Sequence, residues 1–241
     1  MLKFSNVSYC AGGREVLSGL NFELKAGRTL VLLGRSGSGK TTALKMVNAL
    51  LMPSAGEVLV EGRATTAWNP IELRRRIGYA IQETGLFPHF TVARNVAIVP
   101  RLNGWTPDRI EERVHQLLTR VGLAPAEYAH RYPRELSGGQ RQRVGVARAL
   151  AADPPMLLFD EPFGALDPVT RHEVRREFTA LARDLGKTTL FVTHDVREAI
   201  ELGDQIGLLA QGRLEELMPA REFRGAQSRE AQAFLACLRD D

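Results

Sequence analysis

The stretch GRSGSGKT, Gly34–Thr41, decides how the rest of the chain is interpreted. It matches the pattern G-x-x-x-x-G-K-[S/T], and it lies between the continuous apolar run Thr29–Leu33 and a helical pattern from Lys40 to about Leu51. Glycines at this spacing let the backbone curl so that its N–H groups point at phosphate oxygens. The strand–loop–helix order therefore predicts a phosphate-binding loop rather than a glycine-rich turn without a ligand.

Two side chains of this loop suit a nucleoside triphosphate. Lys40 places a positive charge near the β- and γ-phosphates, and the Thr41 hydroxyl can ligate Mg²⁺. ATP and Mg²⁺ are therefore the expected ligands. The loop residues predicted to bind ATP are Gly34, Arg35, Ser36, Gly37, Ser38, Gly39, Lys40, Thr41 and Thr42.

A second apolar run, MLLFDE (Met156–Glu161), ends in two acidic residues. Asp160 would hold Mg²⁺, directly or through water, and Glu161 would be the base that polarises the attacking water. Alone, the string also fits two exposed acids that start a loop before Pro162. Together with the phosphate-binding loop, it predicts ATP hydrolysis, with Lys40 and Glu161 in the catalytic set.

Composition excludes several other classes of protein. Of 241 residues, 44% are hydrophobic and 25% charged, which is typical of a globular protein and not of a disordered chain or a coiled coil. No apolar stretch approaches the ~20 residues of a membrane span, and the first residues contain no apolar signal region. Cys10 and Cys237 are too far apart in sequence to suggest a disulfide framework or a zinc site. The net charge of +4 comes without long basic clusters or stacking aromatics, so no nucleic-acid partner is expected.

The order of predicted elements indicates an α/β fold with a mostly helical insert. The first third contains mainly strands, and the last third alternates strands with helices, which predicts parallel pairing. Between them, Ile110, Val114 and Leu117 recur at helical spacing. We expect one ATPase domain over 1–241: a core of mainly parallel strands with an N-terminal antiparallel β part (1–87 and 151–241), and a helical subdomain over 88–150.

The motif LSGGQ, Leu136–Gln140, directly precedes a further helical pattern. Ser137 can cap that helix, and Gly138 and Gly139 leave backbone N–H groups uncovered. An ordinary Ser-Gly-Gly cap is the alternative. In a chain that already contains one phosphate-binding loop, the motif predicts a second helix end that meets phosphate.

In their order and spacing, these motifs resemble the nucleotide-binding subunit of an ABC transporter over nearly the whole chain. The resemblance implies that Gln82 contacts Mg²⁺ or the attacking water, and that Asp167 is the D-loop aspartate. It also implies that His194 touches the γ-phosphate and that Tyr9 stacks on adenine. The implied catalytic residues are thus Glu161, His194, Gln82 and Lys40, and the implied metal ligands are Thr41, Gln82 and Asp160.

The resemblance further implies a head-to-tail dimer, with itself or with a sister ATPase. Each ATP would lie between one subunit's phosphate-binding loop and the partner's signature residues Leu136, Ser137, Gly138, Gly139 and Gln140. The expected location is the cytoplasmic face of the cell membrane, as a peripheral subunit on integral permease subunits that receive solute from a binding protein. The segment from Gln82 to about Val99 would contact the permease.

Two segments, Ile77–Trp105 and Asp160–Arg171, resemble the osmoprotectant importers, which take up glycine betaine, carnitine or choline. An importer of amino acids or oxyanions is the alternative, as is a soluble ABC ATPase outside transport. The pair of C-terminal nucleotide-sensing domains found in some members is not expected, because the printed sequence ends soon after the core. Ser228–Leu238 predicts a short closing helix.

Overall fold

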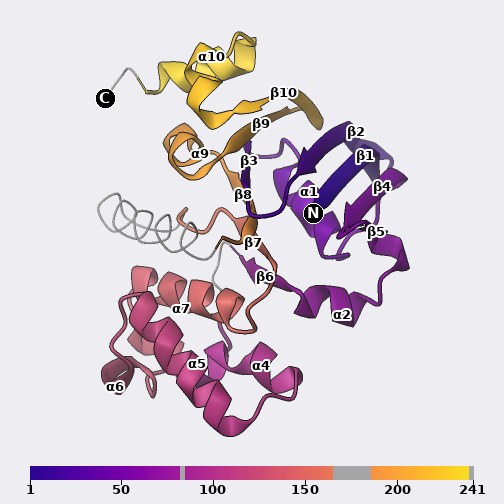
Figure 1. Ribbon diagram of the computed structural model, residues 1–241. Helices are drawn as coiled ribbons and strands as arrows, with labels where there is room; N and C mark the ends of the chain where they lie inside the picture. Colours follow the sequence, from indigo (N-terminus) through magenta and orange to yellow (C-terminus); the bar gives the residue numbers. More distant parts are fainter. Residues whose placement is uncertain (82–84, 165–185, 239–241) are drawn as a thin grey trace. The chain divides into compact units, whose positions relative to one another are not determined.

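The computed structural model in Figure 1 describes residues 1–81, 85–164 and 186–238. The chain divides into two compact units, one formed by residues 1–74 and 187–241 and the other by residues 75–186. The expected helical insert, 88–150, lies wholly within the second unit. Part of the expected alternation of strands and helices in the last third, residues 165–185, lies outside the described residues.

The first unit begins with an antiparallel sheet in the order β2-β1-β4-β5. Its strands are β1 (Leu2–Ala11), β2 (Arg14–Leu24), β4 (Ala55–Val60) and β5 (Arg63–Ala64). Phe4 lies opposite Phe22 on one side and Val58 on the other, and the two phenylalanine rings stack with centroids 4.3 Å apart. Alternating burial along β1 therefore follows the alternation of apolar residues, and the predicted N-terminal β part is confirmed.

Four more strands of this unit lie in the order β10-β9-β3-β8. The strand β3 (Thr29–Leu33) pairs in parallel with β8 (Thr188–Thr193) and β9 (Gln205–Ala210), and β10 (Arg213–Pro219) pairs antiparallel with β9. The apolar run of β3 is buried almost throughout, as expected of a strand covered on both faces. The edge strand β10 was not predicted, because its charged residues leave no continuous apolar run.

Three helices complete the first unit: α1 (Lys40–Val47), α9 (Val196–Leu202) and α10 (Arg229–Ala236). The prediction that the first helix continues to about Leu51 is wrong. It ends at Val47, because Asn48 leaves helical geometry and Ala49 takes a left-handed φ of 53°. Shorter elements are η1 (Thr65–Ala67), α2 (Pro70–Arg75, which reaches the unit boundary) and η3 (Ala220–Gly225).

The second unit joins a parallel pair of strands, β6 (Ile77–Ala80) and β7 (Met156–Asp160), to a group of helices. These are α3 (Val92–Val96), α4 (Ile98–Leu102), α5 (Pro107–Arg120), α6 (Pro125–Tyr128), η2 (Pro133–Glu135) and α7 (Gly138–Leu150). Gly78 lets α7 approach β6 closely, since a Cβ there would lie 2.2 Å from the Ala149 carbonyl oxygen. The predicted α/β fold with a helical insert is thus confirmed.

The helices α5 and α7 satisfy the carbonyl groups at each other's ends. Arg113 of α5 donates to the carbonyl oxygens of Leu150 and Ala151, at 3.0 and 3.2 Å. In return, Arg143 of α7 donates to the Val121 carbonyl oxygen at 2.8 Å. Cations at C-terminal helix ends are favourable, so this exchange fixes the α7 helix within its unit. Of the helices in the described residues, none is both long enough and apolar enough to cross a membrane.

Candidate active site

The phosphate-binding loop runs from the end of β3 to the start of α1, and its glycines are required by geometry. A Cβ on Gly34 would lie 2.2 Å from the Leu209 carbonyl oxygen and 2.7 Å from Ser38 Oγ. Gly39 has a φ of 102°, and a Cβ there would lie 2.4 Å from Leu17 Cδ2. Only glycine fits at these two places, so the glycines allow the curled backbone that is typical of phosphate-binding loops.

The Lys40 side chain reaches back to the start of this loop. Its side chain is buried, and Nζ donates to the carbonyl oxygens of Gly34 at 2.8 Å and Arg35 at 2.9 Å. The helix α1 begins at Lys40 with Gly39 as its N-cap, and no side chain caps it. The Ser38 hydroxyl is buried without a hydrogen-bond partner. A buried cation, an uncapped helix end and an unsatisfied hydroxyl together fit an anionic phosphate group.

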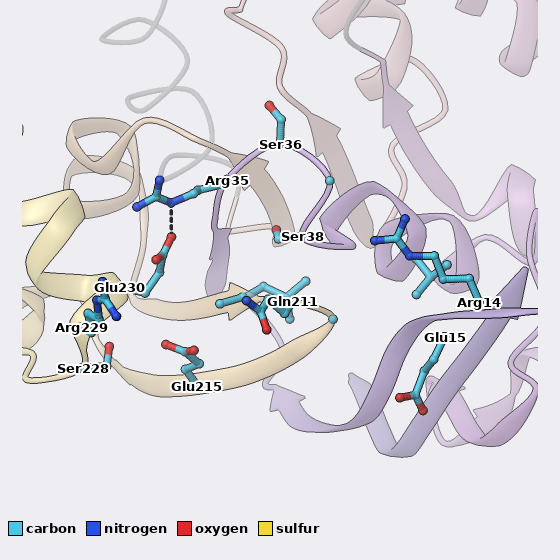
Figure 2. A pocket seen from close by; sticks show the side chains of 15 residues that line it. Arg14, Glu15, Arg35, Ser36, Ser38, Gln211, Glu215, Ser228, Arg229 and Glu230 are labelled. Atoms are coloured by element: carbon cyan, nitrogen blue, oxygen red, sulfur yellow. Dashed lines mark hydrogen bonds and ion pairs between the residues drawn. The ribbon is translucent and has the colours of Figure 1, made fainter.

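A cavity of about 1300 Å³ lies beside the loop (Figure 2). It is lined by the loop residues 35–38, the start of β2, the turn between β9 and β10, and the start of α10. Gly212 of that turn joins two of these walls: its N–H donates to the Ser38 carbonyl oxygen at 3.1 Å, and its own carbonyl oxygen accepts the Ser18 N–H at 2.9 Å. The turn thus holds the loop against β2, next to a space large enough for a nucleotide.

Tyr9, which the resemblance assigns to adenine, lies outside the set of residues that line this cavity. It is half-buried on β1, where Leu17 of β2 is its partner. Its stacking role stays a prediction.

The two predicted acidic residues stand at the end of β7. All five residues of that strand are buried, so Asp160 sits 7% exposed at its last position. Tyr79 of β6 donates its hydroxyl to Asp160 Oδ2 at 3.4 Å, and burial, followed by the nearby Asp160 charge, raises the pKa of Tyr79. Glu161 has a left-handed φ of 46°, a conformation that non-glycine residues adopt mostly at functional sites and turns.

Thr41 in the first unit and Asp160 in the second each carry an oxygen donor of the kind that Mg²⁺ prefers, and their role as metal ligands stays a prediction. Within residues 1–81, 85–164 and 186–238, no three His, Cys, Asp or Glu side chains gather as a metal-binding cluster. Mg²⁺ commonly binds with one or two carboxylates and completes its coordination with substrate phosphates and water. The chemistry of each of these two side chains is compatible with that mode. Gln82, the third expected ligand, lies outside the described residues.

The signature motif forms a capping box at the start of α7. Ser137 Oγ accepts the Gln140 N–H at 3.2 Å, and the Gln140 side chain accepts the Ser137 N–H at 2.9 Å. The predicted cap is confirmed. Gln140 also donates to the Tyr128 hydroxyl at 3.2 Å, and Arg141 donates to the Leu136 carbonyl oxygen at 2.7 Å. The motif is therefore held by hydrogen bonds within its own unit.

His194 follows β8 directly, at the carboxyl end of a strand that pairs in parallel with β3. Its side chain is exposed, whereas Thr193 before it is buried. Asp195 after it caps α9, with Oδ1 accepting the N–H groups of Arg197 at 2.7 Å and Glu198 at 3.3 Å. Asp167, the last implied site residue, lies outside the described residues.

Sequence reasoning missed three groups around these residues: the turn at Gly212, the Glu230 carboxylate opposite Arg35, and the Tyr79 hydroxyl on Asp160. The turn had a signal, since Gln211-Gly212 separates two apolar runs. The other two had none, because a glutamate in a helix and a tyrosine in a strand are common and only folding brings them to their partners.

Comparison with known proteins agrees with this geometry. The sequence model of the family described as "ABC transporter" matches residues 17–164, and the chain belongs to that family. It is 47% identical over 232 residues to the glycine betaine/carnitine/choline transport ATP-binding protein OpuCA of Bacillus subtilis, covering 92% of this chain and 61% of the relative. It is 50% identical over 212 residues to the glycine betaine uptake system ATP-binding protein YehX of Escherichia coli, covering 88% of this chain and 68% of the relative.

A solved structure gives the same result for the fold. The dimeric post-hydrolysis state of the ATP-binding cassette MJ0796, bound to ADP and Pi, matches with a TM-score of 0.81 and 33% identity. The match covers 92% of this chain and 99% of that one. The OpuCA relative is longer than a cassette, since this chain spans only 61% of its length.

Proposed function

We propose that this chain is the ATP-hydrolysing subunit of an ABC importer. The observation that carries the proposal is the loop at Gly34–Thr41, where a buried lysine is the first residue of an uncapped helix in a chain of the ABC transporter family. The direct test is Mg²⁺-dependent release of phosphate from ATP by the purified chain. A chain that neither binds nor hydrolyses ATP would contradict the proposal.

The predicted site residues would divide the work of hydrolysis. The loop N–H groups and Lys40 bind the phosphates, and Thr41 and Asp160 would hold Mg²⁺, with Gln82 as a further ligand. Bound Mg²⁺ neutralises charge that develops on the phosphate oxygens. Glu161 accepts the proton of the attacking water, which contributes about 10²–10⁴-fold to the rate, as positioned bases do. His194 contacts the γ-phosphate from the end of β8.

A second copy, or a sister ATPase, would complete each site. The capped end of α7 is exposed at Ser137 and carries the positive end of a helix of 13 residues. In a head-to-tail pair this end would meet the γ-phosphate bound by the other subunit. Hydrolysis removes the shared anion, so the pair opens again.

The permease would bind the second unit. An open groove of about 790 Å³ is lined there by residues of α3, α5 and α6, including Ala93, Ile110 and Val114. Beside it in sequence, Phe87 is exposed, and the rings of Phe87, His89 and Phe90 pack with centroids 4.6 to 6.1 Å apart. Such an apolar groove with an aromatic neighbour suits an amphipathic cytoplasmic helix of a membrane subunit. We expect a cysteine at His89 to crosslink to that subunit, whereas crosslinks found only from residues of β4 would contradict this site.

The solute proposed is a quaternary-ammonium osmoprotectant, delivered by a solute-binding protein, with the ATPase on the cytoplasmic face of the cell membrane. Support comes from the names of relatives 47 and 50% identical to this chain. The test is uptake of labelled betaine and choline at high salt in a strain that lacks this subunit and other importers of these solutes. Restoration of uptake by this chain together with its permease is the expected result, and uptake of amino acids or sulfate instead would contradict the assignment.

A further inference from the structure

The turn that carries His194 is held through both of its neighbours in the chain. Thr193 is 2% exposed, and its Oγ1 donates to Glu198 Oε2 at 2.6 Å. The same hydroxyl oxygen accepts the Asp195 N–H at 3.0 Å. The residues on either side of His194 therefore belong to one hydrogen-bond network, which leads to the carboxyl group of Glu198.

Glu198 occupies an unusual place for its residue type. Glutamate in the first turn of a helix is ordinarily solvated, where it interacts favourably with the helix dipole. In α9, which packs on β3 and β8, Glu198 is instead only 4% exposed. Burial of a carboxyl group costs free energy unless its oxygens are hydrogen-bonded, so the Thr193 contact offsets a cost that a solvent-facing glutamate would avoid.

We propose that Glu198, acting through Thr193, is a positioning residue for His194. The network fixes the backbone on both sides of an imidazole that itself remains exposed. Such a support keeps the backbone that carries the ring at one place, from which the imidazole can reach the γ-phosphate. The inference rests on the proposed role of His194, and the experiment below separates the two.

A pair of substitutions at Thr193 tests the network. Thr193→Val keeps the shape of the side chain but removes both hydrogen bonds, whereas Thr193→Ser keeps the hydroxyl. For the valine variant we expect kcat for ATP to fall about 10- to 100-fold, the cost of misplacing a catalytic group. The Kd for ATP should stay within about two-fold, since Lys40 and the loop provide most of the phosphate contacts. The serine variant should recover most of the lost kcat.

The strand β8 offers a matched control. Thr189 is also buried on β8, at 1% exposure, but its hydroxyl has no hydrogen-bond partner. Thr189→Val therefore makes the same chemical change in the same strand without touching the network, and we expect unchanged kcat. An equal loss of kcat in both valine variants would show a general effect of substitution in the strand and would overturn the proposal.

The His194→Ala background separates positioning from catalysis. If Glu198 and Thr193 act through His194, Thr193→Val should lower kcat no further in that background. A normal rate in His194→Ala would overturn the role of His194 and this inference together. A slow His194→Ala enzyme with a normal Thr193→Val, or with independent losses in the double variant, would overturn only this inference. Should Thr193→Val not fold, Glu198→Asp, which retracts the carboxyl group, goes through the same cycle and is judged by the same outcomes.

Discussion

Two glycine-rich loops in this chain each lead into a helix, and the two helices differ in whether a side chain caps their N-terminus. At α1 the N-cap is Gly39, with a left-handed backbone and no side-chain cap. At α7 the N-cap is Ser137, which closes a reciprocal hydrogen-bonded box with Gln140. Lys40, the first residue of α1, is buried, whereas Ser137, the N-cap of α7, is exposed.

The difference shows how each end meets phosphate. An uncapped end leaves its N–H groups without side-chain acceptors, so a ligand bound by the same chain completes it. A self-capped end is already stable, and it offers a preformed surface that an anion can approach from outside. The first design suits tight binding by one subunit. The second suits a contact made and broken in each cycle with a partner subunit.

The largest expected effect is at the uncapped end. Lys40→Ala removes the buried cation from the loop, so ATP should bind weakly or not at all and hydrolysis should be lost. Nucleotide affinity by titration calorimetry and phosphate release both measure this. Lys45→Ala, five residues further along the chain, is the matched control and should keep both properties. Near-normal hydrolysis by Lys40→Ala would overturn the assignment of the loop.

The second largest effect is expected at Glu161, where a substitution should slow hydrolysis but leave ATP binding intact. Glu161→Gln keeps the side-chain length and the left-handed backbone, but it removes the base and should slow hydrolysis by about 10²–10⁴-fold. Because the γ-phosphate then persists, the variant should elute as a dimer in size-exclusion chromatography with ATP. Glu57→Gln, an exposed change on β4, should remain like the wild type. A monomer with normal turnover would mean that another residue is the base.

Local sequence was enough to predict the parts of the site that lie within one segment. The strands Thr29–Leu33 and Met156–Asp160 occur at their predicted apolar runs, because a buried parallel strand needs a continuous apolar run. The Ser137 cap was likewise predictable, since its partner is three residues away. Glu198 was not, because its burial depends on α9 packing against strands that are distant in sequence.

The self-capped end should show a smaller effect. Ser137→Ala loses the box and should cost about 0.5–2 kcal/mol of stability, the usual value of a helix cap, visible as a lower Tm. In a Glu161→Gln background it should also weaken the ATP-dependent dimer, while ATP affinity of the monomer stays unchanged. Thr91→Ala, which removes the comparable cap of α3, should lower the Tm without weakening the dimer. Equal weakening by both variants would mean that stability alone, rather than the signature surface, controls the dimer.

The smallest expected effect concerns an ion pair in the lining of the cavity in Figure 2. There, Arg35 Nε of the loop lies 2.5 Å from Glu230 Oε1 of α10. Glu230 raises the pKa of Arg35 through a hydrogen bond and its charge, but the guanidinium is largely exposed and already charged at neutral pH. The pair should therefore add little to stability.

The Glu230 carboxylate does, however, oppose the approach of an anionic ligand to the uncapped end of α1. Glu230→Gln should tighten ATP binding by less than about five-fold, because solvent reaches the ion pair through the exposed Arg35, and this gain should fade as salt is raised. The Arg35→Gln background separates two explanations. If the Glu230 carboxylate repels phosphate directly, Glu230→Gln should alter ATP affinity at low salt by a similar factor in that background. If the carboxylate acts by occupying Arg35, the change in ATP affinity should be smaller. Weaker binding by Glu230→Gln at low salt would mean that α10 supports the loop instead of competing with its ligand.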